Sequence, residues 1–375
     1  PPPPATSCPR SAAMAASVRT RRLAGHVLAS GVASAPALGE VYILSAKRTP
    51  IGATGGSLVD VPATELGSLA ISASLQAAGV RAEDVQECIM GNVLSAGLGQ
   101  APARQAAIGA GLPTSTCCTT VNKVCASGMK AVTMAAQSIM LGHADLAVAG
   151  GMESMSNVPY YLAGQARAGR GFRYGDQKLL DGVAFDGLAD PWKGQPMGVY
   201  GDLCASEHGF SREAQDEFAA RSYQRALTAH DRGAFEQEIV PVTVKAKGGA
   251  TRIVDADEEV GRGRPDTFAK LRPAFGAQGT VTAASSSKIS DGAAALTLAS
   301  GAKVQALGAK PLARILAFAD AEQEPERFTT APAAAVRRAL ARAGLRVEDV
   351  DAWEINEAFG VVVLANVKLL GLDIA

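Results

Sequence analysis

A short segment occurs twice in this chain, and the repeat is the feature that most limits its fold. LQAAGVRAEDV at residues 75–85 matches LARAGLRVEDV at residues 340–350 without a gap. Charged positions match as well as apolar ones, so chance similarity between two Ala-rich helices does not explain the repeat. A helix end and the following turn, repeated in register, indicate a duplicated α/β half. The identical positions are Leu75, Ala78, Gly79, Arg81, Glu83, Asp84 and Val85, and Leu340, Ala343, Gly344, Arg346, Glu348, Asp349 and Val350.

Segments with strand character alternate with segments of helical periodicity around the first copy. The helix expected at 64–78 ends at Gly79, a residue suited to the left-handed conformation that closes a helix. Alternating strands and helices predict βαβ units and a largely parallel sheet. The expected strands are 40–46, 85–94, 121–124 and 144–151, and a second helix is expected at 126–141.

Residues 161–279 differ in character from the rest of the chain, because they are rich in Gly, Asp and Arg. They contain an amphipathic stretch, SREAQDEFAARSYQRALTAHDRG, that predicts a helix ending at Gly233. VPVTV and TRIV, joined through Gly248 and Gly249, predict a hairpin. The expected division is an N-terminal half at 40–160 and 280–309, an inserted domain at 161–279 and an incomplete C-terminal half at 310–375.

Charge balance and cysteine pattern exclude several classes of protein. Lys plus Arg equals Asp plus Glu, at 36 each, so nothing favours a nucleic acid or an anionic membrane as a partner. No apolar run reaches the roughly 20 residues that a membrane helix needs. The six cysteines form no CxxC pair and the four histidines are scattered, so neither a disulfide framework nor a metal cluster is expected.

Residues 1–39 have the composition of an organelle transit peptide. They include four arginines but no Asp or Glu, and they are rich in Ala, Ser and Pro. Translation would begin at Met14, with translated upstream sequence before it; a disordered extension is the alternative. This leader predicts a mitochondrial protein cleaved before Glu40, with the plastid, peroxisome or cytoplasm as alternatives.

Cys125 stands between a strand-like and a helix-like segment, in VNKVCASGMKA at 121–131. The start of a helix carries partial positive charge, which is expected to lower the pKa of this thiol and favour the reactive thiolate. The small residues of CASG would let an acyl group approach, with backbone N–H groups facing a developing oxyanion. A buried structural cysteine is the alternative. Cys117 and Cys118, expected to precede the strand, are weaker candidates.

Four segments are similar to the signature segments of the thiolase family and stand in that family's order: NKVCASGMKA, GGMESMSNVPY, SDGAAAL and EINEAF. The resemblance covers about residues 40–373. It implies the five-layered αβαβα thiolase fold, with two similar halves and a loop domain that binds coenzyme A (CoA). Within the family the segments resemble the acetoacetyl-CoA branch, which condenses two acetyl-CoA to acetoacetyl-CoA and CoA or runs the reverse thiolysis. A homodimer or homotetramer is also implied.

The resemblance assigns two catalytic residues. Cys125 matches the family's acyl-accepting cysteine, which attacks the acetyl thioester and expels CoA. Asn356 of NEAF matches the asparagine that orients a water against the thioester oxygen as enolate charge develops. For Asn356, an exposed helix-start asparagine is the alternative. No separate cofactor is required, since CoA is a substrate.

The resemblance also implies contacts with CoA and with a potassium ion. Ser287 matches a pantetheine contact, although this chain reads SSSKISDG where close relatives have Asn at Ser285 and Ser290. Tyr223 matches a tyrosine near CoA and potassium, and a core position on the amphipathic helix is its alternative. Potassium would also bind the carbonyls of Ala283, Ala284 and Ser286, while Arg262 and Arg264 would meet CoA phosphates or be solvated loop charges.

The family has two further catalytic segments after NEAF, a GHP loop whose histidine activates the nucleophile and a cysteine before a glycine-rich run. Residues 360–375 contain neither. We therefore expect the 375-residue chain to be a fragment without condensation activity when expressed alone. Two other functions stay open. One is a 3-ketoacyl-CoA thiolase for longer chains, a branch with a more polar segment around its cysteine. The other is a non-catalytic CoA-binding or dimer-partner protein.

Overall fold

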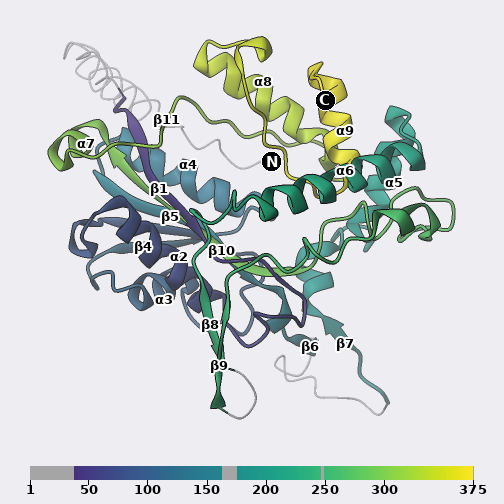
Figure 1. The fold of residues 1–375 in the computed structure, drawn as a ribbon, viewed down its shortest axis with the longest axis horizontal. Coiled ribbons are helices and arrows are strands. Elements are labelled where there is room, and N and C mark those ends of the chain that lie inside the picture. Colours follow the sequence, from purple (N-terminus) through teal and green to yellow (C-terminus); the bar gives the residue numbers. More distant parts are fainter. Residues whose placement is uncertain (1–37, 163–174, 246–248, 375) are drawn as a thin grey trace, which may run out of the picture. The chain divides into compact units, whose positions relative to one another are not determined.

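The structure is a computed structural model that describes residues 38–162, 175–245 and 249–374. The chain divides into two units, Pro1–Leu38 and Gly39–Ala375. The leader expected at 1–39 lies almost wholly outside the described residues, as does Gly248 of the expected hairpin. All elements described below belong to the second unit, which Figure 1 shows.

A mixed sheet runs through this unit (Figure 1). In spatial order its strands are β11 (Ala313–Ile315), β1 (Val41–Arg48), β10 (Ser290–Ser300), β5 (Leu146–Ser154), β3 (Glu87–Gly91) and β4 (Cys117–Val121), and β2 (Gly52–Ala53) pairs with β10. β3 is parallel to β4 and β5. β10 is antiparallel to β1, β2 and β5, and β1 is antiparallel to β11.

The prediction of a largely parallel sheet is therefore wrong for the side that contains β10. Strands β3, β4 and β5 are parallel because α3 (Pro102–Gly109) and α4 (Ser127–Met140) carry the chain back between them. β10 has no such crossover helix from β5. It follows the long segment at 155–289 and enters the sheet from the opposite end, antiparallel to its neighbours.

Helices cover both faces of the sheet, as the alternation of strand side chains shows. Cys88 and Met90 of β3 pack in one core with α2 (Ala63–Ala78) and α3, whereas Ile89 packs in a second core with α4. Val148 of β5 belongs to the first core and Ala149 to the second. Strand residues that are buried on both faces place the sheet between two helical layers. The helices expected at 64–78 and 126–141 are confirmed.

The region between β5 and β10 contains the two features expected there. The amphipathic helix is confirmed as α6 (Arg212–Asp231), whose N-cap Ser211 accepts a hydrogen bond from the Ala214 N–H at 3.2 Å. The hairpin is confirmed as β8 (Val242–Lys245), antiparallel to β9 (Thr251–Val254). The other elements are η2 (Met155–Asn157), β6 (Tyr160–Leu162), β7 (Leu179–Asp181), η3 (Ala184–Leu188), α5 (Met197–His208) and η5 (Pro265–Lys270).

A fully buried amide holds together the elements of the last part of the chain. This part comprises α7 (Gly301–Leu307), β11, η6 (Pro325–Thr330), α8 (Ala331–Ala343), η7 (Val347–Asp349) and α9 (Gly360–Leu370). Asn366 of α9 donates to the carbonyls of Thr329 and Val362 at 2.8 and 2.7 Å and accepts from the Ala333 N–H at 2.8 Å. Among the described residues no helix is both long and apolar enough to cross a bilayer.

The two copies of the repeat have the same local geometry. α2 ends at Gly79 with φ +64°, and α8 ends at Gly344 with φ +68°. Such angles favour glycine, because a Cβ would meet the neighbouring backbone. Each copy continues into a one-turn helix, η1 (Ala82–Asp84) or η7, fixed by a guanidinium–carboxylate pair. The pairs are Arg81 with Asp84 at 2.8 Å and Arg346 with Asp349 at 2.9 Å.

Candidate functional site

Cys125 lies in a strained turn between β4 and α4. β4 ends at Val121 and α4 begins at Ser127, so the thiol precedes the N-cap residue Ala126. Val124 has φ +48°, a left-handed conformation that a β-branched residue rarely adopts. The Asn122 carboxamide oxygen accepts from the Val124 N–H at 2.9 Å, which helps to hold the turn. No residue type in VNKVCASG signals this strain, so the sequence alone did not predict it.

The start of α4 sits directly against the end of β3. A Cβ placed on Gly91 would lie 2.5 Å from the carbonyl carbon of Ser127, a separation that real Cβ atoms do not adopt. Glycine is thus required at this position. The Ser127 hydroxyl also accepts from the Lys123 N–H at 2.8 Å, which ties the helix start to the preceding loop. These contacts fix the direction in which Cys125 leaves the sheet.

The structure overturns the expected lowering of the Cys125 pKa. Burial by the surrounding protein raises the pKa of the Cys125 thiol, although the residue is exposed at the surface, and the nearby Glu153 carboxylate raises it further. Glu153 is held there by hydrogen bonds from Asn92, Val93 and Leu94, at 2.9, 2.8 and 3.1 Å. The thiol precedes the N-cap Ala126 and so lies outside the first helical turn, where the dipole is strongest.

The thiol with the lowered pKa is Cys118. Cys117 and Cys118 are the first two residues of β4, so the expectation that they precede the strand is wrong. Cys118 is paired in register with buried Cys88 of β3. A hydrogen bond from Cys88, aided by the Arg104 guanidinium, lowers the pKa of Cys118 to about 7. The pKa of Cys88 is correspondingly raised well above its ordinary value.

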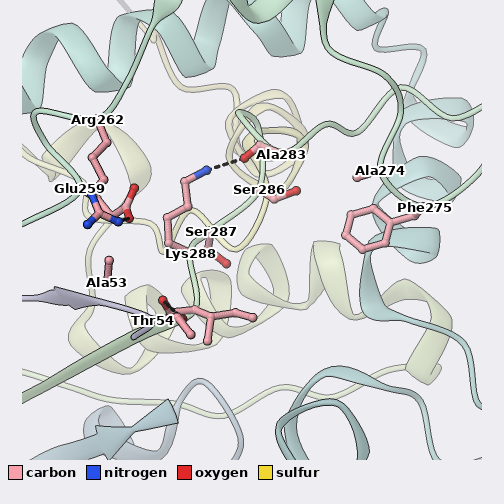
Figure 2. A pocket seen from close by; sticks show the side chains of 11 residues that line it. Ala53, Thr54, Glu259, Arg262, Ala274, Phe275, Ala283, Ser286, Ser287 and Lys288 are labelled. Atoms are coloured by element: carbon pink, nitrogen blue, oxygen red, sulfur yellow. Dashed lines mark hydrogen bonds and ion pairs between the residues drawn. The ribbon is translucent and has the colours of Figure 1, made fainter. Parts of the chain in front are cut away.

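A separate groove gathers several of the residues expected to bind CoA. It has a volume of about 420 Å³ and lies between the 283–289 loop, the turn near β2 and the loop that carries Arg262 (Figure 2). Arg262, Ala283, Ser286 and Ser287 all line it. Its other lining residues are Ala53, Thr54, Glu259, Ala274, Phe275, Lys288 and Ile289. Cys125, Tyr223, Arg264, Ala284 and Asn356 are not among the residues that line it.

The wall of this groove is joined to the NEAF segment by backbone hydrogen bonds. The Ser287 N–H donates to the Ala358 carbonyl at 3.0 Å, and the Gly360 N–H donates to the Ser285 carbonyl at 2.8 Å. Two segments far apart in the sequence thus run side by side. Asn356 lies two residues before Ala358 and is exposed. Its side chain makes no hydrogen bond to the described residues.

Helix α6 supports the same junction. The Ser222 hydroxyl donates to the Glu357 carboxylate at 2.7 Å, next to Asn356 in the chain. Tyr223, one residue further along α6, packs edge-on against Phe268 with ring centroids 5.5 Å apart. Tyr223 therefore contributes to a small apolar cluster, and its ring face is turned toward Lys288, whose Nζ lies 5.9 Å from the ring centroid.

Both candidate arginines are exposed, and they differ in their partners. Arg262 lines the groove and pairs with Glu258 and, at 3.2 Å, with Glu259. Arg264 lies outside the groove, where its carbonyl accepts from the Thr267 N–H at 2.8 Å. Of the two, only Arg262 is placed to meet a ligand in the groove, and its carboxylate partners compete for it.

Two of the sequence segments noted above are joined by a buried carboxylate. Asp291 of SDGAAAL is fully buried and accepts from the Ser156 N–H at 2.9 Å and the Ser156 hydroxyl at 2.6 Å. Ser156 belongs to GGMESMSN. This contact fixes the end of β10 to the turn after β5. Both segments stand out in the sequence, but this contact could not be predicted from it, because the two residues are far apart in the chain.

Comparison with known proteins identifies the family. Residues 41–302 match the model described as "Thiolase, N-terminal domain" and residues 309–375 match "Thiolase, C-terminal domain". The chain belongs to the thiolase family. It is 54% identical over 335 residues to the Schizosaccharomyces pombe protein named "Acetyl-CoA acetyltransferase", covering 89% of this chain and 84% of that protein. It is 52% identical over 342 residues to the Mus musculus protein named "Acetyl-CoA acetyltransferase, mitochondrial", covering 91% of this chain and 80% of that protein.

A solved thiolase shows the same fold. The crystal structure of the Acat5 thiolase from Ascaris suum, in complex with coenzyme A, matches with a TM-score of 0.83 and 43% identity. The match covers 89% of this chain and 85% of that chain. The mixed sheet with helices on both faces is thus the thiolase fold, and the resemblance read from four short segments is confirmed.

The potassium site implied by the thiolase resemblance does not fit the residues present here. One of its expected ligands, the Ala283 carbonyl, accepts a hydrogen bond from the Lys288 ammonium (Figure 2). The same ammonium faces the ring of Tyr223, another expected ligand. A second cation beside this ammonium would be repelled by it.

Proposed function

We propose that this thiolase is an acetyl-CoA C-acetyltransferase, which condenses two acetyl-CoA to acetoacetyl-CoA and CoA or runs the reverse thiolysis. One observation carries the proposal: the loop expected to bind pantetheine is hydrogen-bonded to NEAF, through Ser287 and Ala358 at 3.0 Å. A ligand-binding loop and a catalytic segment are thereby held together. The relatives described above, which carry the name of this activity, support the choice of substrate.

The first step uses the Cys125 sulfur. As a thiolate it attacks the carbonyl carbon of the acetyl thioester, the bond from that carbon to the CoA sulfur breaks, and CoA leaves with a proton. The acetyl group remains on Cys125. The exposed position of Cys125 admits a thioester. Backbone N–H groups at the start of α4 would stabilise the oxyanion of the tetrahedral intermediate.

The second step forms the new carbon–carbon bond. A second acetyl-CoA loses a methyl proton to a base, which the resemblance assigns to the cysteine before a glycine-rich run. The resulting carbanion attacks the acetyl carbonyl on Cys125, the bond from that carbon to the Cys125 sulfur breaks, and the thiolate and acetoacetyl-CoA are released. Asn356 would orient a water toward the thioester oxygen, where enolate charge develops. The raised pKa of Cys125 means that its thiol needs a base to reach the thiolate. The resemblance assigns this base to the histidine of a GHP loop.

CoA would lie along the groove at the 283–289 loop. Ser287 is exposed in the groove wall and is proposed to contact pantetheine. Arg262 is proposed to contact a CoA phosphate, since its guanidinium can exchange Glu259 for a phosphate of higher charge. For Arg264 we propose only a long-range electrostatic contribution, because it lies outside the groove.

We also propose a domain organisation, an oligomeric state and a cellular location for the protein. The matched geometry at Gly79 and Gly344 supports two duplicated halves of a five-layered αβαβα arrangement, at 40–160 with 280–309 and at 310–375. Residues 161–279 are proposed as the CoA-binding loop domain. We further propose a homodimer or homotetramer and mitochondrial import directed by the leader at 1–39. The name of the mouse relative, which includes the word mitochondrial, supports the import.

Thiolysis measurements test the proposed activity. A purified version of the protein that includes the GHP loop should cleave acetoacetyl-CoA with CoA faster than it cleaves a long-chain 3-ketoacyl-CoA. Comparable rates on the long chain would favour the broader 3-ketoacyl-CoA thiolase. Tight CoA binding with no acetyl transfer to Cys125 and no turnover would favour the non-catalytic CoA-binding role.

A further inference from the structure

Lys288 contacts two of the residues that the thiolase resemblance assigns to a potassium ion, Ala283 and Tyr223. Its ammonium donates to the Ala283 carbonyl and lies 5.9 Å from the centroid of the Tyr223 ring (Figure 2 shows the first contact). We propose that the Lys288 ammonium is a tethered replacement for a monovalent cation, so that this site is organised without potassium. The inference rests on the proposed function only in treating the groove as part of the CoA site.

The contacts of Lys288 are those that a bound monovalent cation would make. Carbonyl oxygens and aromatic faces attract ammonium groups and alkali cations through the same electrostatics. Lys288 is half-buried, and burial lowers its pKa while the Glu259 carboxylate opposes that shift. The Glu259 carboxylate thus favours the charged form of Lys288. Tethering places this charge permanently in the groove.

The other charged side chains that line the groove, Arg262 and Glu259, pair with each other and not with Lys288. Arg262, the other cation that lines it, is paired with Glu258 and Glu259. Within the described part of the chain, Lys288 forms no salt bridge within 4.0 Å. Its partners are therefore a neutral carbonyl and a neutral ring. Lys288 stabilises the loop in the way that an ion would, and does not serve as half of an ion pair.

The aromatic partner of Lys288 is held in place before any ligand binds. Phe268 packs on the edge of the Tyr223 ring at 5.5 Å. Gly263 approaches the ring so closely that a Cβ there would lie 2.3 Å from Tyr223 Cδ1. The ring therefore cannot turn its face away without moving the loop between Arg262 and Arg264. A fixed ring face is what a tethered cation requires.

Two substitutions separate a lost charge from a lost side chain. Lys288→Ala removes the ammonium and leaves room for an ion, whereas Lys288→Met removes the charge and keeps most of the volume. The melting temperature without CoA and the Kd for CoA would be measured in potassium chloride and in tetramethylammonium chloride at equal ionic strength. The wild-type protein should give the same values in both salts.

Lys288→Ala should bind CoA roughly tenfold more weakly in tetramethylammonium and recover in potassium, as expected for loss of one charge-assisted contact. Its melting temperature should also rise with potassium. Lys288→Met should be weakened in both salts. A wild-type protein that itself needs potassium would overturn the proposal, as would a Lys288→Ala variant that potassium fails to restore or that matches the wild type. If the wild type binds no CoA, the proposed function fails, but the melting temperatures still decide the role of Lys288.

Discussion

The backbone N–H of Ser287 donates to the carbonyl of Ala358 over 3.0 Å. This bond joins the loop that lines the groove to the segment that contains Asn356. A second support comes from α6, where Ser222 donates to Glu357 at 2.7 Å. Chemistry that needs both a bound pantetheine and a water-orienting asparagine depends on this junction, so its rigidity can be tested separately from turnover.

Glu357→Ala removes the acceptor of the Ser222 hydroxyl. We expect the Ser287 and Gly360 amides to exchange their hydrogens severalfold faster, as expected for losing one side-chain hydrogen bond of about 1 kcal/mol. Hydrogen exchange followed by mass spectrometry measures this. Glu357→Gln retains an acceptor oxygen and should exchange like the wild type. Equal exchange in all three proteins would show that Ser222 does not support the junction.

Asp291→Asn should destabilise the protein, because an amide presents one acceptor oxygen where two donors of Ser156 now meet a carboxylate. The position is fully buried. An unsatisfied buried donor costs about 1–3 kcal/mol, and urea unfolding would show that loss of stability. Asp60→Asn, at an exposed carboxyl, is the control and should change little. A similar small effect at both positions would refute a structural role for Asp291.

Cys118 should react with iodoacetamide before Cys125 at pH 7.5. The pKa of Cys118 is lowered to about 7, so most of it is thiolate there, whereas the pKa of Cys125 is raised. The hydrogen bond from Cys88 is the largest cause of the lowered Cys118 pKa. Cys88→Ala should therefore move the midpoint of Cys118 labelling to higher pH, and Cys88→Ser should move it less. The rate of iodoacetamide labelling of each cysteine is measured as a function of pH by peptide mass spectrometry. A midpoint unmoved by Cys88→Ala would contradict the assigned cause.

Val124→Gly should stabilise the chain by up to about 1 kcal/mol, because glycine adopts φ +48° without the strain of a branched side chain. Part of that gain is offset by the larger conformational freedom of glycine in the unfolded chain. Val124→Ala keeps a Cβ and should gain less. The comparison is made by thermal unfolding at equal protein concentration. A Val124→Gly variant less stable than Val124→Ala would mean that the side chain's contacts outweigh the strain.

Local pattern predicted the elements that depend on neighbouring residues. The ends of α2 at Gly79 and of α6 near Gly233 followed from capping chemistry, and both glycines adopt positive φ. Strand direction did not follow, because the orientation of β10 depends on where the long segment at 155–289 returns to the sheet. The pattern of neighbouring residues does not indicate at which end of the sheet this segment leads into β10.

The candidate site, too, has features that the sequence predicts and features that only the folded structure shows. Ser287 and Arg262, which were expected to contact different parts of CoA, line the same groove. The pKa of Cys125 was predicted in the wrong direction, since it is raised first by burial and then by the Glu153 carboxylate, and both result from folding and not from sequence adjacency. Lys288 drew no attention in the sequence, because a lysine in a serine-rich loop looks solvated. Its role depends on Tyr223, which lies on α6 far back in the chain.

The most direct test is the site at which acetyl-CoA acylates a purified version of the protein that includes the GHP loop. After incubation with acetyl-CoA and rapid acid quenching, peptide mass spectrometry should find one acetyl group on the peptide that contains Cys125, and Cys125→Ala should carry none. The label should leave when free CoA is added, because the first step is reversible. Acetyl groups on Cys88, Cys117, Cys118 or Cys204, persisting in Cys125→Ala, would contradict the assignment of Cys125 as the acyl acceptor.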